Sequence, residues 1–159
     1  MQEQKEHIEL SALLPLIREV ISRGGEFELH PRGESMLPTI CQGRDTVMLS
    51  ALDRPPVRGD LLLYQRDTGA FVLHRVVRVA KDGTLSMRGD NQYFIERGIR
   101  KDQVIAVVRR YYRCGREMRT DSLRVRLYGT RRTLTYPFRR LSRAIARRVK
   151  RLFGGKTHG

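Results

Sequence analysis

The sequence predicts a mainly β domain that follows one helix and precedes a basic amphipathic helix. Residues 7–23 carry apolar side chains at helical spacing, whereas from residue 26 short β-type runs alternate with turn signals. Basic residues gather in the last third of the chain. We therefore expect an N-terminal helix in residues 1–25, a β domain in residues 26–113 and a basic extension in residues 114–159.

The N-terminal helix is expected over residues 7–23, because Gly24-Gly25 can end it. Its apolar positions recur at steps of three and four and so share one face: Ile8, Leu10, Leu13, Leu14, Leu16, Ile17, Val20 and Ile21. Ser11 could instead cap the helix, with Pro15 in its first turn or shortly after. The start of the helix therefore stays open.

Six or seven short strands are expected in the β domain. The runs that predict them are residues 27–30, 46–49, 61–65, 71–80, 84–88 and 103–113. Turn signals at Asp67-Thr68-Gly69 and Lys81-Asp82-Gly83 join several of them closely. Short strands joined by tight turns are typical of an all-β domain.

The net charge of +15 lies entirely in the C-terminal third. Residues 1–108 hold 15 basic and 15 acidic residues, whereas residues 109–159 hold 17 basic residues and only two acidic ones. A neutral domain followed by a basic segment indicates that the segment has a partner of its own.

Residues 136–153 combine an apolar stripe at helical spacing with many arginines. This pattern is typical of interfacial binding to anionic membranes, and the candidate contacts are Arg139, Arg140, Arg143, Arg147 and Arg148. Packing of the stripe on the β domain is the alternative. We do not expect nucleic acid as a partner, because no nucleic-acid-binding module or helix-turn-helix is recognised.

No apolar run approaches the roughly 20 residues of a membrane-spanning helix. The polar, acidic N-terminus also differs from a secretory signal. We therefore expect a cytoplasmic or peripheral membrane protein. Two cysteines and four histidines show no metal-ligand spacing, so no metal or other cofactor is expected and both thiols should be reduced.

Four short segments carry the residues suited to catalysis. They are Gly33–Ile40 with Ser35, Arg58–Leu62, Leu73–Val77 with His74, and Met87–Asn91 with Asp90. A serine hydroxyl becomes a nucleophile when a neighbouring base takes its proton, and a neutral imidazole can do so near neutral pH.

The order and content of these segments resemble the S24/S26 serine peptidases, which include type I signal peptidases and self-cleaving repressor proteases. The resemblance covers roughly residues 26–110. It implies a signal-peptidase/S24-like β-barrel or ribbon domain in which Ser-Met-x-Pro-Thr presents Ser35. It also implies a base just before the Arg-Val-Val run and a Gly-Asp-Asn segment that closes the site.

The base position holds His74, where most bacterial signal peptidases have lysine. This variant looks like the endoplasmic-reticulum, archaeal and spore-former branch, which uses a Ser–His arrangement. No lysine lies between Lys5 and Lys81, which excludes a Ser–Lys dyad at the usual place. His74 is therefore the expected base.

A third group that orients the histidine is expected among the acidic residues. Asp90 in Gly89-Asp90-Asn91 is the best match to the family's acid segment, and Glu96 is the alternative. Asp60 lies in a turn-like Gly-Asp setting and is expected to be structural.

The resemblance also places groups around the nucleophile. The Ser35 N–H is expected to bind the oxyanion, and Met36 to flank the substrate pocket. Gly33 stands where some relatives have a serine hydroxyl, so the oxyanion hole is expected to depend on backbone groups.

The leading hypothesis is a serine endopeptidase that cleaves a signal or leader peptide through an acyl-enzyme on Ser35. The resemblance implies a peptide or preprotein substrate held as an extended strand. A catalytically inactive peptide- or membrane-binding module is one alternative. A self-cleaving DNA-associated regulator is another, but its sole candidate scissile bond, Cys114-Gly115, follows the catalytic segments instead of preceding them.

Overall fold

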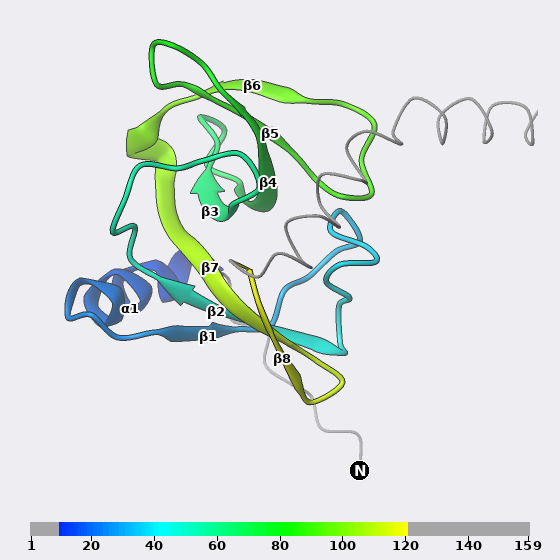
Figure 1. Cartoon of the computed structure of the whole chain (residues 1–159). Helices are drawn as coiled ribbons and strands as arrows, with labels where there is room; N and C mark the ends of the chain where they lie inside the picture. Colours follow the sequence, from blue (N-terminus) through cyan, green and yellow to red (C-terminus); the bar gives the residue numbers. More distant parts are fainter. Residues whose placement is uncertain (1–9, 121–159) are drawn as a thin grey trace, which may run out of the picture.

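The computed structural model describes residues 10–120 as one helix and an open, antiparallel sheet of eight strands (Figure 1). The elements are α1 (Leu10–Ser22), β1 (Phe27–Leu29), β2 (Asp45–Ser50), β3 (Leu61–Gln65), β4 (Phe71–Val79), β5 (Leu85–Arg88), β6 (Glu96–Ile99), the 3₁₀ turn η1 (Lys101–Gln103), β7 (Val104–Arg113) and β8 (Arg116–Arg119). The predicted mainly β class with a leading helix is confirmed.

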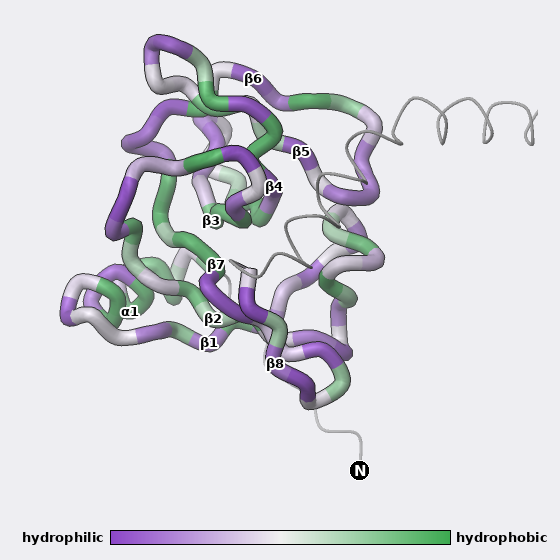
Figure 2. The backbone as a smooth tube through the Cα atoms, viewed as in Figure 1, coloured by the Kyte–Doolittle hydropathy of each residue, from purple (hydrophilic) through white to green (hydrophobic). Residues whose placement is uncertain are grey.

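Strand β7 connects the two halves of the sheet. The strand order is β1-β2-β7-β3-β4-β5-β6, with β8 paired to β7. Val107 pairs with Ser50 of β2 on one side and with Leu62 of β3 on the other, whereas Arg110 pairs with Arg119 of β8. Figure 2 shows the matching change along β7, from hydrophobic beside β3 to hydrophilic beside β8.

Strand β3 contributes to two separate cores because successive side chains point to opposite faces. Leu61 and Leu63 belong to the core that also contains α1, whereas Leu62 and Tyr64 belong to a second core with β4, β5 and β6. All four side chains are buried. The unbroken apolar run of this strand therefore reflects burial on both faces.

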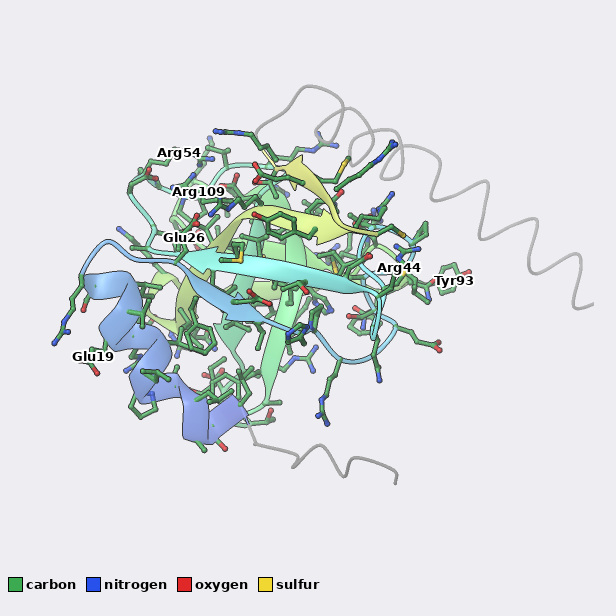
Figure 3. All side chains as sticks on the ribbon, turned by 90° about the horizontal axis from the view of Figure 1, so that it is seen from below. Glu19, Glu26, Arg44, Arg54, Tyr93 and Arg109 are labelled. Atoms are coloured by element: carbon green, nitrogen blue, oxygen red, sulfur yellow. The ribbon has the colours of Figure 1, made fainter. Side chains whose placement is uncertain are left out.

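Helix α1 covers one face of the sheet through Ile17 and Ile21, while Glu19 points away from the sheet (Figure 3). Pro15 lies inside the helix. Gly24 has a positive φ of 77°, and the N–H groups of Gly24 and Gly25 donate to the carbonyls of Ile21 and Val20. This is a Schellman ending, and it lies at the Gly-Gly pair that was expected to end the helix.

Two strands, β6 and β8, were not predicted from the sequence. β8 follows a tight turn in which Cys114 and Gly115 both have positive φ, 49° and 74°. The sheet thus continues to Arg119, past the predicted domain end at residue 113. No helix within residues 10–120 has the length and apolar character needed to cross a membrane. The predicted basic helix and the five arginines named as membrane contacts lie outside the described residues.

We predict that Ile17→Ala lowers the free energy of unfolding by about 2–5 kcal/mol, because it opens a cavity between α1 and the sheet. Leu16→Ala is the control on the same helix, since Leu16 is 48% exposed and should change stability little. Urea unfolding followed by circular dichroism measures both. Equal effects of the two variants would contradict the packing of α1 described above.

Candidate active site

The segment that carries Ser35 is a compact series of turns between β1 and β2. The Leu37 N–H donates to the Glu34 carbonyl at 3.2 Å, and the Ile40 N–H to the Met36 carbonyl at 3.0 Å. Met36 and Ile40 are buried in the core beneath α1. These two anchors fix the turn, and Ser35 stays partly accessible beside them.

The Gly-Asp-Asn segment packs directly on Ser35. The Asn91 N–H donates to the Ser35 carbonyl at 2.8 Å. A Cβ atom at Gly89 would lie only 2.6 Å from the same carbonyl oxygen, so this position accepts glycine alone without a shift of the backbone. The contact explains why a glycine accompanies Ser35 at position 89.

Asp90 forms a buried ion pair with Arg75. Arg75 Nε and Nη2 donate to the two carboxylate oxygens at 2.9 and 2.8 Å, and the Thr39 hydroxyl donates to Asp90 Oδ2. Arg75 Nη1 also donates to the Gly59 carbonyl at 3.0 Å. Asp90 therefore ties the serine turn to β4, whereas His74 Nδ1 forms its hydrogen bond with Tyr64 and not with Asp90.

His74 lies on β4, opposite Leu62 of β3, and its side chain is only 1% exposed. Tyr64 is the diagonal neighbour on β3, and the two ring centroids are 6.0 Å apart. The distance between Tyr64 Oη and His74 Nδ1 is 3.1 Å. The imidazole is thus oriented by a phenol group on the adjacent strand.

Glu96, the alternative acid of the sequence analysis, reaches His74 through this tyrosine. Tyr64 Oη donates to Glu96 Oε2 at 2.7 Å. Arg66 Nε and Nη2 hold the Glu96 carboxylate with hydrogen bonds of 2.8 and 2.7 Å. Because the single Tyr64 proton goes to Glu96, the phenol oxygen accepts the proton of His74 Nδ1. Nε2 is then the basic nitrogen.

The electrostatics of the cluster keep His74 neutral at pH 7. Burial lowers its pKa from 6.5 to about 4, against the opposing influence of Glu96. The Arg66 guanidinium lowers the pKa of the Glu96 carboxyl, and burial together with Glu96 raises the pKa of the Tyr64 phenol. Glu96 is therefore a carboxylate, and Tyr64 keeps its proton.

Ser35 and His74 line the same pocket, of about 210 Å³, together with Gly33 and Met36. His74 Nε2 is buried and has no hydrogen-bond partner among the described residues. Within residues 10–120 neither the hydroxyl nor the N–H of Ser35 forms a hydrogen bond. The two residues that line the pocket thus carry an unpaired ring nitrogen, an unpaired hydroxyl and an unpaired backbone N–H, which are the kinds of group that acyl transfer requires.

A larger groove of about 750 Å³ adjoins this pocket and shares Phe71 and Leu73 with it. Its walls come from α1, β1 and the β3–β4 hairpin, and its apolar lining includes Leu13, Phe27 and Leu29. β1 is the last strand in the sheet order, so its outer edge faces no other strand of the described sheet.

The remaining candidate residues have structural surroundings. The Asp60 carboxylate accepts hydrogen bonds from the Val57 N–H and from Arg54, as the turn prediction expected. Cys41 and Cys114 are free thiols. In residues 10–120 no group of three or more His, Cys, Asp and Glu side chains is arranged to hold a metal ion.

Tyr64 and Arg66 are the site residues that the sequence analysis missed. Both follow the apolar run of β3, where a tyrosine reads as an ordinary strand residue. Their connection to His74 depends on the register between β3 and β4 and on the position of β6. A signal was present in the hairpin turn at residues 67–69, which fixes that register.

Comparison with known proteins assigns no family to the chain. No protein-family model and no curated protein sequence matches it. The function is therefore inferred from the four motifs and from the geometry that brings them together.

We predict that Asp90→Ala lowers the free energy of unfolding by about 3–5 kcal/mol, because it leaves the buried Arg75 charge without its carboxylate. Asp53→Ala is the control, since Asp53 pairs with Arg109 at the surface and its loss should have little effect. Chemical denaturation measures both variants. Wild-type stability in Asp90→Ala, combined with lost activity, would instead return Asp90 to the role of third catalytic residue.

Proposed function

We propose that this chain is a serine endopeptidase of the S24/S26 kind, similar to signal peptidase I, with Ser35 as nucleophile and His74 as base. The observation that carries the proposal is the buried, neutral His74, whose Nε2 has no hydrogen-bond partner among the described residues and which lines the same pocket as Ser35. Support also comes from the packing of Gly89 and Asn91 on Ser35, because it joins motifs that are separate in the sequence. A signal-peptidase/S24-like barrel or ribbon fold is part of the proposal.

The reaction begins with proton transfer from the Ser35 hydroxyl to His74 Nε2 while Oγ attacks the scissile carbonyl carbon. The Ser35 N–H binds the resulting oxyanion. The imidazolium then gives its proton to the departing amine, and the peptide C–N bond breaks to leave an acyl-enzyme. Water, activated by the same nitrogen, hydrolyses the ester and restores Ser35.

The substrate of the proposal is a signal or leader peptide bound as an extended strand. The free edge of β1 and the apolar groove beside it can accept such a strand, since main-chain hydrogen bonds and side-chain pockets then act together. The pocket at Ser35 is small, which agrees with small residues before the cut.

Peripheral contact with an anionic membrane completes the proposal. It is supported by the net charge of +15 and by three consecutive exposed apolar residues, Tyr93, Phe94 and Ile95. They follow Gln92, which lines the pocket, and Tyr93 lies at the end of the molecule away from α1 (Figure 3). A membrane at this end would lie close to the entrance of the site.

We predict that Ser35→Ala abolishes cleavage of leader-like peptides and leaves peptide binding intact, because it removes only the nucleophile. Ser50→Ala is the matched control, since this serine lies on β2 and contacts Glu26 away from the pocket. Mass spectrometry of the products, with and without vesicles of anionic lipid, measures cleavage. If the wild type binds peptide or vesicles but cuts under neither condition, the chain is a binding module.

We predict that the acid limb of kcat/KM lies near pH 4 and not near pH 6.5, since burial lowers the pKa of His74 to about 4. The free energy of unfolding should also fall as the pH drops from 6.5 towards 4, because in this range His74 is protonated in the unfolded chain but stays neutral in the native state. Initial rates and thermal unfolding across this range measure both effects. An acid limb at pH 6.5 would show a solvated His74 and contradict the buried site.

A further inference from the structure

We infer that Tyr64 and Glu96 are positioning residues for His74, with Tyr64 carrying the effect of the Glu96 carboxylate to the base. The inference deepens the proposed peptidase function and rests on it. The relevant contacts form one chain: Arg66 binds Glu96, Glu96 accepts the Tyr64 proton, and the Tyr64 oxygen faces His74 Nδ1.

The arrangement fixes the direction of every proton in the cluster. Glu96 is held by two Arg66 hydrogen bonds, so it is an ionised acceptor and directs the Tyr64 hydroxyl towards itself. The Tyr64 oxygen then offers His74 a lone pair and no proton. Only the Nδ1–H tautomer satisfies this contact, and that tautomer leaves a lone pair on Nε2, which has no hydrogen-bond partner among the described residues.

The same contacts support the imidazolium that forms during the reaction. When His74 accepts the Ser35 proton, its positive charge develops in a core where Tyr64 is fully buried and His74 is 1% exposed. The Nδ1–H to Tyr64 hydrogen bond then becomes charge-assisted and stronger. Tyr64 keeps its own proton, because burial and Glu96 raise the pKa of its phenol. Tyr64 and Glu96 therefore act on His74 by orientation and electrostatics, without a second proton transfer.

Asp90 is poorly placed for this task. Both of its carboxylate oxygens bind Arg75, which follows His74 on β4. Successive residues of a strand point to opposite faces, so the Arg75 pair and the Tyr64 contact lie on different sides of β4. The charged groups that influence His74 are Glu96 and Asp90, which favour its protonated form, and Arg66, which opposes it.

The test compares Tyr64→Phe and Glu96→Gln with the wild type. We expect kcat to fall about 10- to 100-fold in each variant with KM little changed, the size expected for a hydrogen bond to a charged group. The acid limb of Glu96→Gln should also move to lower pH. The Glu96 carboxylate raises the pKa of His74 in the wild type, so its loss lowers that pKa. Tyr111→Phe is the control, as Tyr111 is a buried tyrosine of the other core.

A second readout does not depend on catalysis. Nitrogen-15 chemical shifts of histidine in the full chain report the tautomer of His74, and we expect the Nδ1–H form in wild type and in Tyr111→Phe. Tyr64→Phe should shift the population towards the other tautomer, because Nδ1–H loses its acceptor. Circular dichroism verifies that each variant is folded, and Glu96→Gln replaces Tyr64→Phe as the deciding variant if the latter unfolds.

The two readouts separate the inference from the proposed function. If the wild type cleaves no peptide but Tyr64→Phe changes the His74 tautomer, the peptidase function fails and the positioning contact stands. If the wild type cleaves and the deciding variant leaves kcat within twofold and the tautomer unchanged, the inference is overturned.

Discussion

The buried ion pair between Arg75 and Asp90 is the contact on which the candidate site depends. It joins β4, the Gly-Asp-Asn segment, the serine turn through Thr39 and the residue 59 turn through the Gly59 carbonyl. Burying two charges costs free energy, and only parallel hydrogen bonds with further donors offset that cost. Such a pair tolerates few alternative geometries, so it sets the position of Ser35 relative to β4 and hence to His74.

Because side chains alternate along β4, the neighbouring residues His74 and Arg75 contact different groups on opposite sides of the strand. Arg75 points to the side where Asp90 holds the loops together, and His74 points to the side of Tyr64 and Glu96. Each carboxylate therefore has its own arginine: Arg75 binds Asp90 and Arg66 binds Glu96. This separation lets Asp90 stabilise the fold while Glu96 binds the tyrosine that contacts His74.

The sequence predicted the helix, six of the eight described strands and four of the residues that line the pocket, Gly33, Ser35, Met36 and His74, because each has a local signal. Alternating apolar residues and turn dipeptides identify strands such as β3 and β4. β6 and β8 lack such signals, since Glu96–Ile99 and Arg116–Arg119 carry few apolar residues. The contact of Tyr64 with His74 depends on strand register, and the distribution of Asp90 and Glu96 between their partners depends on tertiary packing. Neither feature can be predicted from a short sequence motif.

A fully buried histidine that is to act as a base needs contacts such as those from His74 through Tyr64 to Glu96. Burial keeps His74 neutral and ready to accept a proton, but it also disfavours the imidazolium that acceptance creates. A carboxylate in direct contact with Nδ1 would favour the cation strongly and raise the pKa of His74. The interposed Tyr64 weakens that effect, and Arg66 weakens it further by partly neutralising Glu96. In the proposed reaction, His74 thus stays neutral in the resting site, while the Tyr64 oxygen is already in place as an oriented acceptor when the imidazolium forms.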